Sequence, residues 1–254
     1  MRLLQAIYTV AFALLIVVGS AQAQELRFNA NHKFKTVQFT DVHWIYNDPA
    51  SEEAAERMRE VLDAERPDLV IYTGDIIFAK PAAPALQRAL EPVIERGIPF
   101  AVTWGNHDDE QDMTRAELSA YIKDMKGNLT SHTEGISGQT NYTLSVRSAD
   151  GERDAAVLYI FDSHSYSKIE KVKGYDWIKH DQDLHCSKQR KALARTGLYA
   201  YSVARDARHD AEPEHLHGRH TQGDGLRTRN QHGSCHGNAL GWRCNGSVCG
   251  PRPR

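Results

Sequence analysis

Three apolar segments separated by helical patterns constrain the fold of this chain more than any other feature. In the first, 34–40, apolar and polar residues alternate, as in a strand with one buried face. The second and third, 69–72 and 98–104, are almost continuously apolar, as expected of parallel strands covered on both faces. We therefore expect an α/β fold with a parallel sheet and right-handed crossovers.

The segments between and after these strands carry helix signals. Ser51 is the expected N-cap of the first helix, because two glutamates follow it, and this helix should end before Pro67. Apolar residues at helical spacing predict a second helix over 84–96 and a third over 113–126. Together with the strands, these helices give the alternating order of a layered α/β domain.

Two further strands are expected at 142–146 and 157–161, joined by a polar turn at 148–151. A chain of 254 residues with 41% hydrophobic content is long enough for one large domain. The formal net charge of -2 excludes a basic nucleic-acid-binding surface. The sequence does not indicate an oligomeric state.

The N-terminus has the layout of a signal peptide. Arg2 precedes an apolar stretch from Leu3 to Val18, and small residues end at Ala23. We expect cleavage after Ala23 and export to the periplasm or the medium. The alternative is a membrane anchor, although the apolar stretch is short of the ~20 residues of a spanning helix. We expect no span in the mature chain.

Polar side chains follow each of the three predicted parallel strands. Asp41 and His43 follow the first, Gly74 and Asp75 follow the second, and the block Gly-Asn-His-Asp at 105–108 follows the third. The carboxyl ends of parallel strands meet at one edge of a sheet. Neighbouring strands lie about 4.8 Å apart, and the cations of a two-metal centre lie about 3.5–4 Å apart. Adjacent strand ends can therefore supply one binuclear site.

The residue types at these strand ends suit metal ions. Asp41 and His43 can approach the same cation with a carboxylate oxygen and an imidazole nitrogen, which suit Zn, Fe or Mn. Asp75 has two oxygens, so it can bridge two cations. Asn106 would offer a neutral carbonyl oxygen to the second cation. We predict two divalent or trivalent metal ions at this edge, with Asp41, His43, Asp75 and Asn106 as ligands.

His107 is the predicted catalytic residue of the same block. Its imidazole is free to stabilise or protonate an oxygen of a substrate, and Asp108 or Asp109 is expected to orient it. The contiguous Asp, Ser and His at 162–164 are not a catalytic triad, because neighbours on a strand point to opposite faces.

These three blocks resemble those of the calcineurin-like metallophosphoesterase superfamily. The segments FDSHSYS at 161–167 and WIKHDQ at 177–182 resemble its exported branch, which is related to purple acid phosphatases. The resemblance covers about 34–195 and implies a layered α/β/β/α sandwich with a binuclear metal centre that hydrolyses phosphate esters. Purple acid phosphatases carry a tyrosine ligand where this chain has Phe78, so an iron–tyrosinate centre and its colour are not expected.

The resemblance also implies a role for each residue of the predicted site. Asp41, His43 and Asp75 would hold one metal ion, and Asp75 and Asn106 would hold the other. His107 would lie beside the scissile phosphate. The substrate would be a phosphate ester, and the enzyme a phosphatase or a phosphodiesterase.

The chain after Arg195 departs from the superfamily. It lacks the later histidine blocks and reads as an irregular tail at 196–254, rich in Arg, His and Gly. When the segments 194–206 and 230–254 are back-translated and read one base later, codon choices exist that give a His-Ile-Pro block and a Gly-His-Asp-His block. We interpret the tail as frameshifted, which leaves the C-terminal part of the fold incomplete. Residues 1–23 are then the signal peptide, and 24–195 are the N-terminal part of the metallophosphoesterase domain.

Three alternatives remain open. The tail could be genuine and bind a metal through its six histidines and three cysteines, although their spacing matches no standard zinc pattern. Without the later histidines we expect little or no hydrolysis, so the chain could also be a non-catalytic remnant that binds metal or phosphate. A third outcome is a misfolded product with exposed apolar strand edges.

Overall fold

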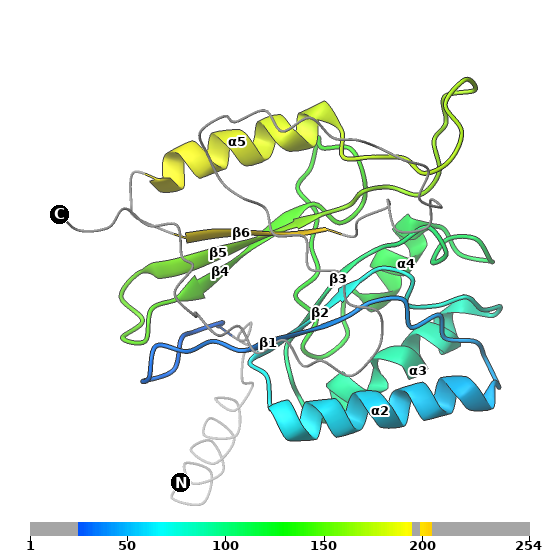
Figure 1. The fold of residues 1–254 in the computed structure, drawn as a ribbon, viewed down its shortest axis with the longest axis horizontal. Coiled ribbons are helices and arrows are strands. Elements are labelled where there is room, and N and C mark those ends of the chain that lie inside the picture. Colours follow the sequence, from blue (N-terminus) through cyan, green and yellow to red (C-terminus); the bar gives the residue numbers. More distant parts are fainter. Residues whose placement is uncertain (1–24, 195–198, 205–254) are drawn as a thin grey trace, which may run out of the picture.

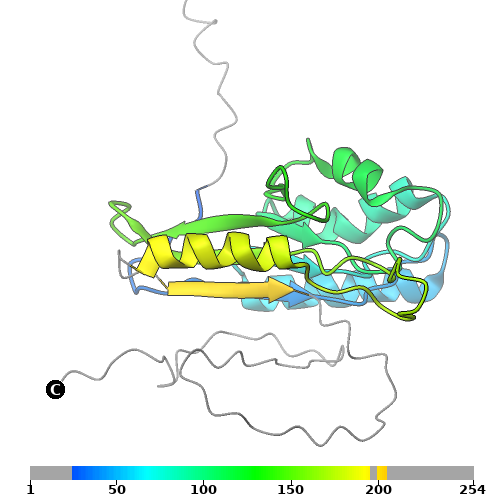
Figure 2. The ribbon, with the colours of Figure 1, turned by 90° about the horizontal axis from the view of Figure 1, so that it is seen from above.

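The computed structural model describes residues 25–194 and 199–204. In this part of the chain, two three-stranded sheets pack between helices (Figure 1). The helices α2, α3 and α4 cover one sheet, and α5 covers the other, so the layers follow the order α/β/β/α (Figures 1 and 2). The expected layered sandwich is confirmed.

The first sheet is parallel and has the order β1-β2-β3. Its strands are β1 (Thr36–Phe39), β2 (Leu69–Thr73) and β3 (Phe100–Thr103). Every residue of β2 and β3 is buried, as the continuous apolar runs predicted. The three strands run in the same direction, so the three polar blocks emerge at one edge of the sheet.

The first helix begins earlier than predicted. It is α2 (Pro49–Glu65), and its N-cap is Asp48, whose side chain accepts a hydrogen bond from the backbone N–H of Ala50. Ser51 is therefore not the cap but a buried residue of the first turn, where its hydroxyl accepts from the N–H of Ile45 at 2.9 Å. The Asp-Pro pair explains the shift, because proline is favoured at the first helical position.

The other two helices of this half also differ at their ends from the predictions. They are α3 (Ala82–Glu95) and α4 (Arg115–Ile122). In α4, Thr114 and Glu117 form a capping box, which fixes the start of the helix two residues later than expected.

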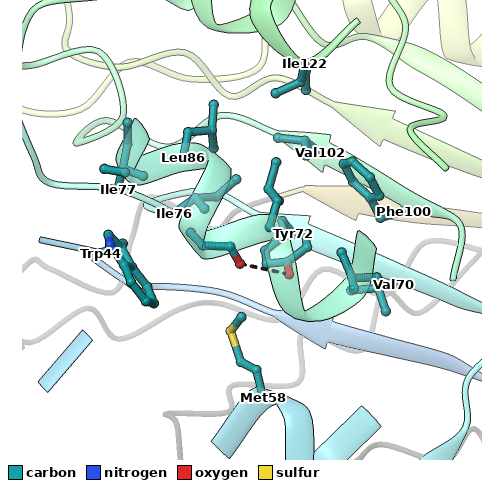
Figure 3. Close-up of a cluster of buried hydrophobic side chains, with 14 of the residues drawn as sticks. Trp44, Met58, Val70, Tyr72, Ile76, Ile77, Leu86, Phe100, Val102 and Ile122 are labelled. Atoms are coloured by element: carbon teal, nitrogen blue, oxygen red, sulfur yellow. Dashed lines mark hydrogen bonds between the residues drawn. The ribbon is translucent and has the colours of Figure 1, made fainter. Parts of the chain in front are cut away.

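A large hydrophobic core fills the space between the first sheet and its helices. Figure 3 shows Val70, Tyr72, Phe100 and Val102 of the sheet together with Met58 of α2 and Leu86 of α3. The Tyr72 hydroxyl lies in this core and donates a hydrogen bond to the carbonyl of Ala89. Ile76 and Ile77, which directly follow Asp75, are also fully buried. The loop that carries Asp75 is thus anchored in the core.

The second sheet has the order β4-β5-β6. Its strands are β4 (Tyr142–Arg147), β5 (Asp154–Phe161) and β6 (Tyr199–Ala204). β4 pairs with β5 in antiparallel orientation, as expected of a short polar turn. β6 pairs with β5 in parallel orientation, which departs from the prediction of an irregular chain after Arg195. The edge of β5 that does not face β4 presents backbone N–H and C=O groups, and β6 pairs with them.

The two sheets pack face to face through a second core. It contains Leu69, Ile71 and Ala101 from the first sheet, and Tyr142 and Ile160 from the second. On the outer face of the second sheet, Val157 and Tyr159 pack against Cys186 of α5 (His180–Ala194). The sequence patterns did not predict α5, because charged and polar residues cover most of its length.

Several predictions concern residues outside the described ranges. The signal peptide at 1–23, and the interpretation of 205–254 as a frameshifted tail, fall on residues whose structure is not described. Within 25–194 and 199–204, no helix is long and apolar enough to span a membrane.

Candidate metal and phosphate site

The loops after β1 and β2 continue side by side beyond the ends of their strands. The backbone N–H of Asp41 donates to the carbonyl of Gly74 at 3.1 Å, and the N–H of His43 donates to that of Asp75 at 2.9 Å. Asp41, His43 and Asp75 have positive φ angles of 55°, 48° and 52°. Such angles are unfavourable for residues with a Cβ and persist only where the surrounding structure holds them.

Three side chains with metal-ligating atoms converge at this edge. The ligand atoms of His43, Asp75 and His107 all lie within 4.8 Å of one another. His43 Nε2 lies 3.2 Å from Asp75 Oδ2, and the imidazole rings of His43 and His107 are 5.0 Å apart at their centroids. Two imidazoles and one carboxylate are a donor set that suits Zn, Fe or Mn. The residues therefore fit a transition-metal ion.

Asp75 is fully buried and is central to this arrangement. Its Oδ1 accepts a hydrogen bond from the backbone N–H of His107 at 3.0 Å, while its Oδ2 faces His43. The two oxygens thus face two different loops. The predicted bridging of two cations by this carboxylate stays a prediction.

The two carboxylates that were predicted to orient His107 have other partners: Asp109 lies 3.3 Å from Arg115, and Asp108 binds backbone groups. The Asp108 carboxylate accepts hydrogen bonds from four backbone N–H groups, those of Asp75, Ile76, Ile77 and Gly105, at 2.7–3.0 Å. Complete burial raises the pKa of Asp108 to about 6, although the hydrogen bonds from Gly105 and Ile77 oppose this shift. The role of Asp108 is to tie the loop after β2 to the loop after β3.

Glu110 is the residue that contacts the His107 ring. Its Oε2 lies 2.7 Å from His107 Nδ1, and its Oε1 accepts a 2.6 Å hydrogen bond from the hydroxyl of Tyr166. The same hydroxyl accepts a hydrogen bond from Asn106 Nδ2 at 2.9 Å. Sequence reasoning missed Glu110 and Tyr166, because Glu110 follows the Gly-Asn-His-Asp block and Tyr166 comes from a distant segment.

Asp41 and Phe78 lie at the exposed side of the site. Asp41 does not belong to the group of three ligand atoms, and its Oδ2 accepts a hydrogen bond from the hydroxyl of Thr40 at 2.5 Å. Phe78 is half exposed, and its ring lies 5.3 Å from that of His107 in an edge-on arrangement. The structure brings His43, Asp75 and His107 together most closely and leaves Asp41 at the rim.

A buried ion pair connects the site loops to the second sheet. Arg115, the first residue of α4, donates to Asp162 Oδ1 at 2.6 Å and to the carbonyls of Trp104 and Gly105. Burial alone would raise the pKa of Asp162, but the charge of Arg115 and backbone hydrogen bonds hold it below its usual value. Asp162 is thus a structural anion.

The contiguous residues 162–164 do not form a triad. The N–H of His164 donates to Asp162 Oδ1, and the ring of His164 lies against Gln182, with 3.1 Å between Nε2 and Oε1. The side chains of Asp162 and His164 therefore serve two separate local networks, as the sequence analysis expected.

Comparisons with known proteins point to one family. The family model described as "Calcineurin-like phosphoesterase" matches residues 34–238, further than the 34–195 over which the motifs were recognised. The chain is 35% identical over 184 residues to "Phosphatase DCR2" of Saccharomyces cerevisiae. It is 31% identical over 205 residues to "Probable inactive purple acid phosphatase 29" of Arabidopsis thaliana.

These matches cover 63% and 70% of this chain, but 32% of the yeast protein and 53% of the plant protein. The chain therefore spans about half or less of the length of these curated relatives. A crystal structure of a dimetal phosphatase from Danio rerio superposes with a TM-score of 0.51 at 13% identity. That superposition covers 67% of this chain and 69% of the zebrafish chain, and it supports the fold.

Proposed function

Because this chain belongs to the calcineurin-like phosphoesterase family, we propose that its site serves metal-dependent hydrolysis of phosphate esters. One observation carries the proposal. The side chains of His43, Asp75 and His107 come from three different strand ends and place their ligand atoms within 4.8 Å of one another. Three separate loops, two of them with strained backbone angles, are needed to build this arrangement.

The proposed centre contains two metal ions held by Asp41, His43, Asp75 and Asn106. Bound cations supply positive charge to a phosphate ester and lower the pKa of a coordinated water. The neutral amide of Asn106 would hold a cation without reducing its charge. His107 belongs to the same close group of side chains, but we assign it to the substrate rather than to a cation. In its protonated form its imidazole would donate a proton or a hydrogen bond to an oxygen of the substrate.

We expect little or no hydrolysis by the 254-residue chain. The segment 196–254 contains no Gly-His-x-His block, so the second cation would have fewer ligands than the family pattern supplies. A non-catalytic remnant that binds metal or phosphate is the second candidate. One observation favours it: the plant relative with 31% identity carries the description "Probable inactive".

The test measures hydrolysis and binding separately. The purified chain is loaded with Mn²⁺, Zn²⁺ or Fe²⁺ and assayed with a chromogenic phosphate monoester and a chromogenic diester, with Asp75→Asn as the inactive control. Slow, metal-dependent release of phosphate that Asp75→Asn abolishes supports the enzyme. Saturable metal binding with no release above that of Asp75→Asn supports the remnant.

Export remains part of this proposal. The support is the sequence of residues 1–23, with Arg2 before an apolar stretch and small residues at its end. The mass of the protein recovered from the periplasm or medium of an expressing cell tests it. A mature chain that begins at Gln24 supports export, whereas an uncleaved chain in the cytoplasmic fraction contradicts it.

A further inference from the structure

An arm of the second half of the molecule reaches the candidate site. Tyr166 and Tyr175 face each other in an antiparallel bridge with stacked rings 5.6 Å apart. The N–H of Ser167 donates to the carbonyl of Gly174, and that of Asp176 donates to the carbonyl of Ser165, so residues 163–176 form an arm. The hydroxyl of Ser165 donates a 3.4 Å hydrogen bond to the backbone carbonyl of Asn106, whereas Tyr166 contacts the side chains of Asn106 and Glu110.

The hydrogen bonds around Tyr166 form one chain with a defined direction. Asn106 Nδ2 donates to the Tyr166 hydroxyl, and this hydroxyl donates to Glu110 Oε1. The other carboxylate oxygen, Oε2, lies 2.7 Å from His107 Nδ1. An ionised carboxylate can only accept hydrogen bonds. The proton of the neutral His107 ring therefore belongs on Nδ1, which leaves the Nε2 lone pair available to the site. Nε2 can donate to a substrate only when the ring carries a second proton.

The hydrogen bond between Glu110 and His107 lies at the surface of the site. The side chain of Glu110 is 26% exposed, and that of His107 is 29% exposed. Both groups are therefore partly shielded from water while they remain accessible from the site.

The same chain fixes the amide of Asn106. Asn106 is buried, with 3% of its surface exposed, and an amide carries its nitrogen and its oxygen on opposite branches. Because Nδ2 is directed at Tyr166, Oδ1 is directed away from the arm. A carbonyl oxygen in this orientation is the atom that a cation requires.

We propose that Glu110 and Tyr166 are positioning residues that set the His107 tautomer and the Asn106 amide orientation, through which the arm at 163–176 controls the site. The arrangement resembles the general case in which a carboxylate orients a functional histidine from behind. The proposal rests on the proposed function for the roles of Asn106 and His107. The His107 tautomer and the Asn106 orientation can nevertheless be tested without measuring hydrolysis.

The first experiment reads the tautomer directly. Long-range ¹H–¹⁵N correlation spectra of the metal-free, ¹⁵N-histidine-labelled chain show which ring nitrogen carries the proton, and a His107→Asn variant assigns the signal among the 13 histidines. We expect the Nδ1–H tautomer for wild-type His107. We also expect a measurable shift toward Nε2–H in Glu110→Gln, because its amide cannot accept from both His107 and Tyr166.

The second experiment measures cation affinity by calorimetric titration of Mn²⁺. Tyr166→Phe removes the partner of Asn106 Nδ2 and should weaken Mn²⁺ binding about tenfold, the lower end of the range for supporting groups around metal sites. It should leave His107 in the Nδ1–H tautomer, because Glu110 is retained. Glu110→Gln should thus change the tautomer, and Tyr166→Phe should change the Mn²⁺ affinity but not the tautomer. A general loss of structure would not separate the two effects in this way.

Two control variants lose comparable hydrogen bonds on the surface, away from the candidate site. Tyr121→Phe removes a hydroxyl bonded to Gln87 on the surface of α3, and Glu60→Gln alters a carboxylate paired with Arg57 on α2. Neither should change the His107 signal or the Mn²⁺ affinity. Circular dichroism with thermal melts shows whether Glu110→Gln and Tyr166→Phe remain folded, and Glu110→Asp offers a milder replacement if Glu110→Gln does not.

The outcomes separate this inference from the proposed function. A wild-type Nε2–H tautomer, or an unchanged tautomer in Glu110→Gln together with unchanged affinity in Tyr166→Phe, overturns the positioning roles even if the chain hydrolyses phosphate esters. The expected tautomer and affinity changes support those roles even if no hydrolysis is detected. In that case only the proposed reaction fails.

Discussion

The strands of the first sheet are more completely buried than β4 and β5 of the second. In the first, every residue of β2 and β3 is buried between three helices and the second sheet. In the second, β4 alternates between buried and exposed residues, and the apolar contacts described for α5 involve Val157 and Tyr159. The deeply buried core of the first half can hold the strained backbone angles of Asp41, His43 and Asp75.

The shallower half contributes to the site through a small number of polar contacts. Asp162 holds Arg115, which in turn binds the carbonyls of Trp104 and Gly105, and Tyr166 contacts Asn106. In our proposal, the first half supplies the metal ligands and the second half orients Asn106 and His107.

Breaking the ion pair between the halves should have the largest effect. Arg115→Ala leaves Asp162 buried without its cation and removes donors from two buried carbonyls, so we expect a loss of about 3–5 kcal/mol in unfolding free energy. Urea denaturation measures it. The control Asp109→Asn alters the weaker partner of Arg115, at 3.3 Å, and should cost less than 1 kcal/mol. Similar losses in the two variants would show that the ion pair between Arg115 and Asp162 does not stabilise the fold.

Substitutions of two leucines test the difference in burial between the two halves. Leu90 of α3 is fully buried, whereas Leu184 of α5 is 44% exposed. We expect Leu90→Ala to cost about 2–5 kcal/mol through lost burial and a cavity, and Leu184→Ala to stay within about 0.5 kcal/mol. The same denaturation experiment measures both. A comparable cost at the two positions would mean that the second half is packed as tightly as the first.

A smaller effect is expected at the start of α4. Thr114 caps this helix, and its side chain accepts from the N–H of Glu117. Thr114→Ala should cost about 1 kcal/mol, and because Arg115 is the first residue of the helix, Mn²⁺ affinity should weaken with it. Thr114→Ser retains the hydroxyl and is the control. If serine loses as much stability as alanine, the cap does not contribute.

The smallest expected effect is the acid dependence that comes from Asp162. Its pKa is lower in the folded chain than the unfolded value of about 3.9. The ionised group therefore stabilises the fold above that pH, and the contribution is lost as the pH falls through the folded pKa. We expect the stability difference between wild type and Asp162→Asn to shrink in acid. A difference that is constant from neutral to acid pH would contradict this assignment.

Much of the fold was predictable because burial leaves a strong pattern. The continuous apolar runs of β2 and β3 and the polar turn between β4 and β5 correctly placed four strands. Local chemistry shifted the ends of the helices, since Asp48 rather than Ser51 caps α2. The helix α5 escaped prediction because its sequence is mostly charged and polar, so only tertiary contacts reveal which face is buried.

The site was predictable only in part. Polar blocks after three parallel strands identified His43, Asp75 and His107, because strand topology alone brings them to one edge. The partners of these groups depend on loop geometry. Asp108 adjoins His107 in the sequence yet binds backbone N–H groups, while Glu110 three residues later contacts the ring. The contact of Tyr166 with Asn106 could be found only from the folded structure, since sixty positions separate the two residues.

Metal binding is the most direct test of the central claim, that three strand ends form a cation site. Mn²⁺ or Zn²⁺ is titrated calorimetrically into the metal-free chain, into Asp75→Asn, and into the surface control Asp63→Asn, which loses an exposed ion pair with Arg96. The account predicts saturable binding that Asp75→Asn weakens by at least about tenfold and Asp63→Asn leaves unchanged. Absence of saturable binding, or equal affinity in all three proteins, would contradict it.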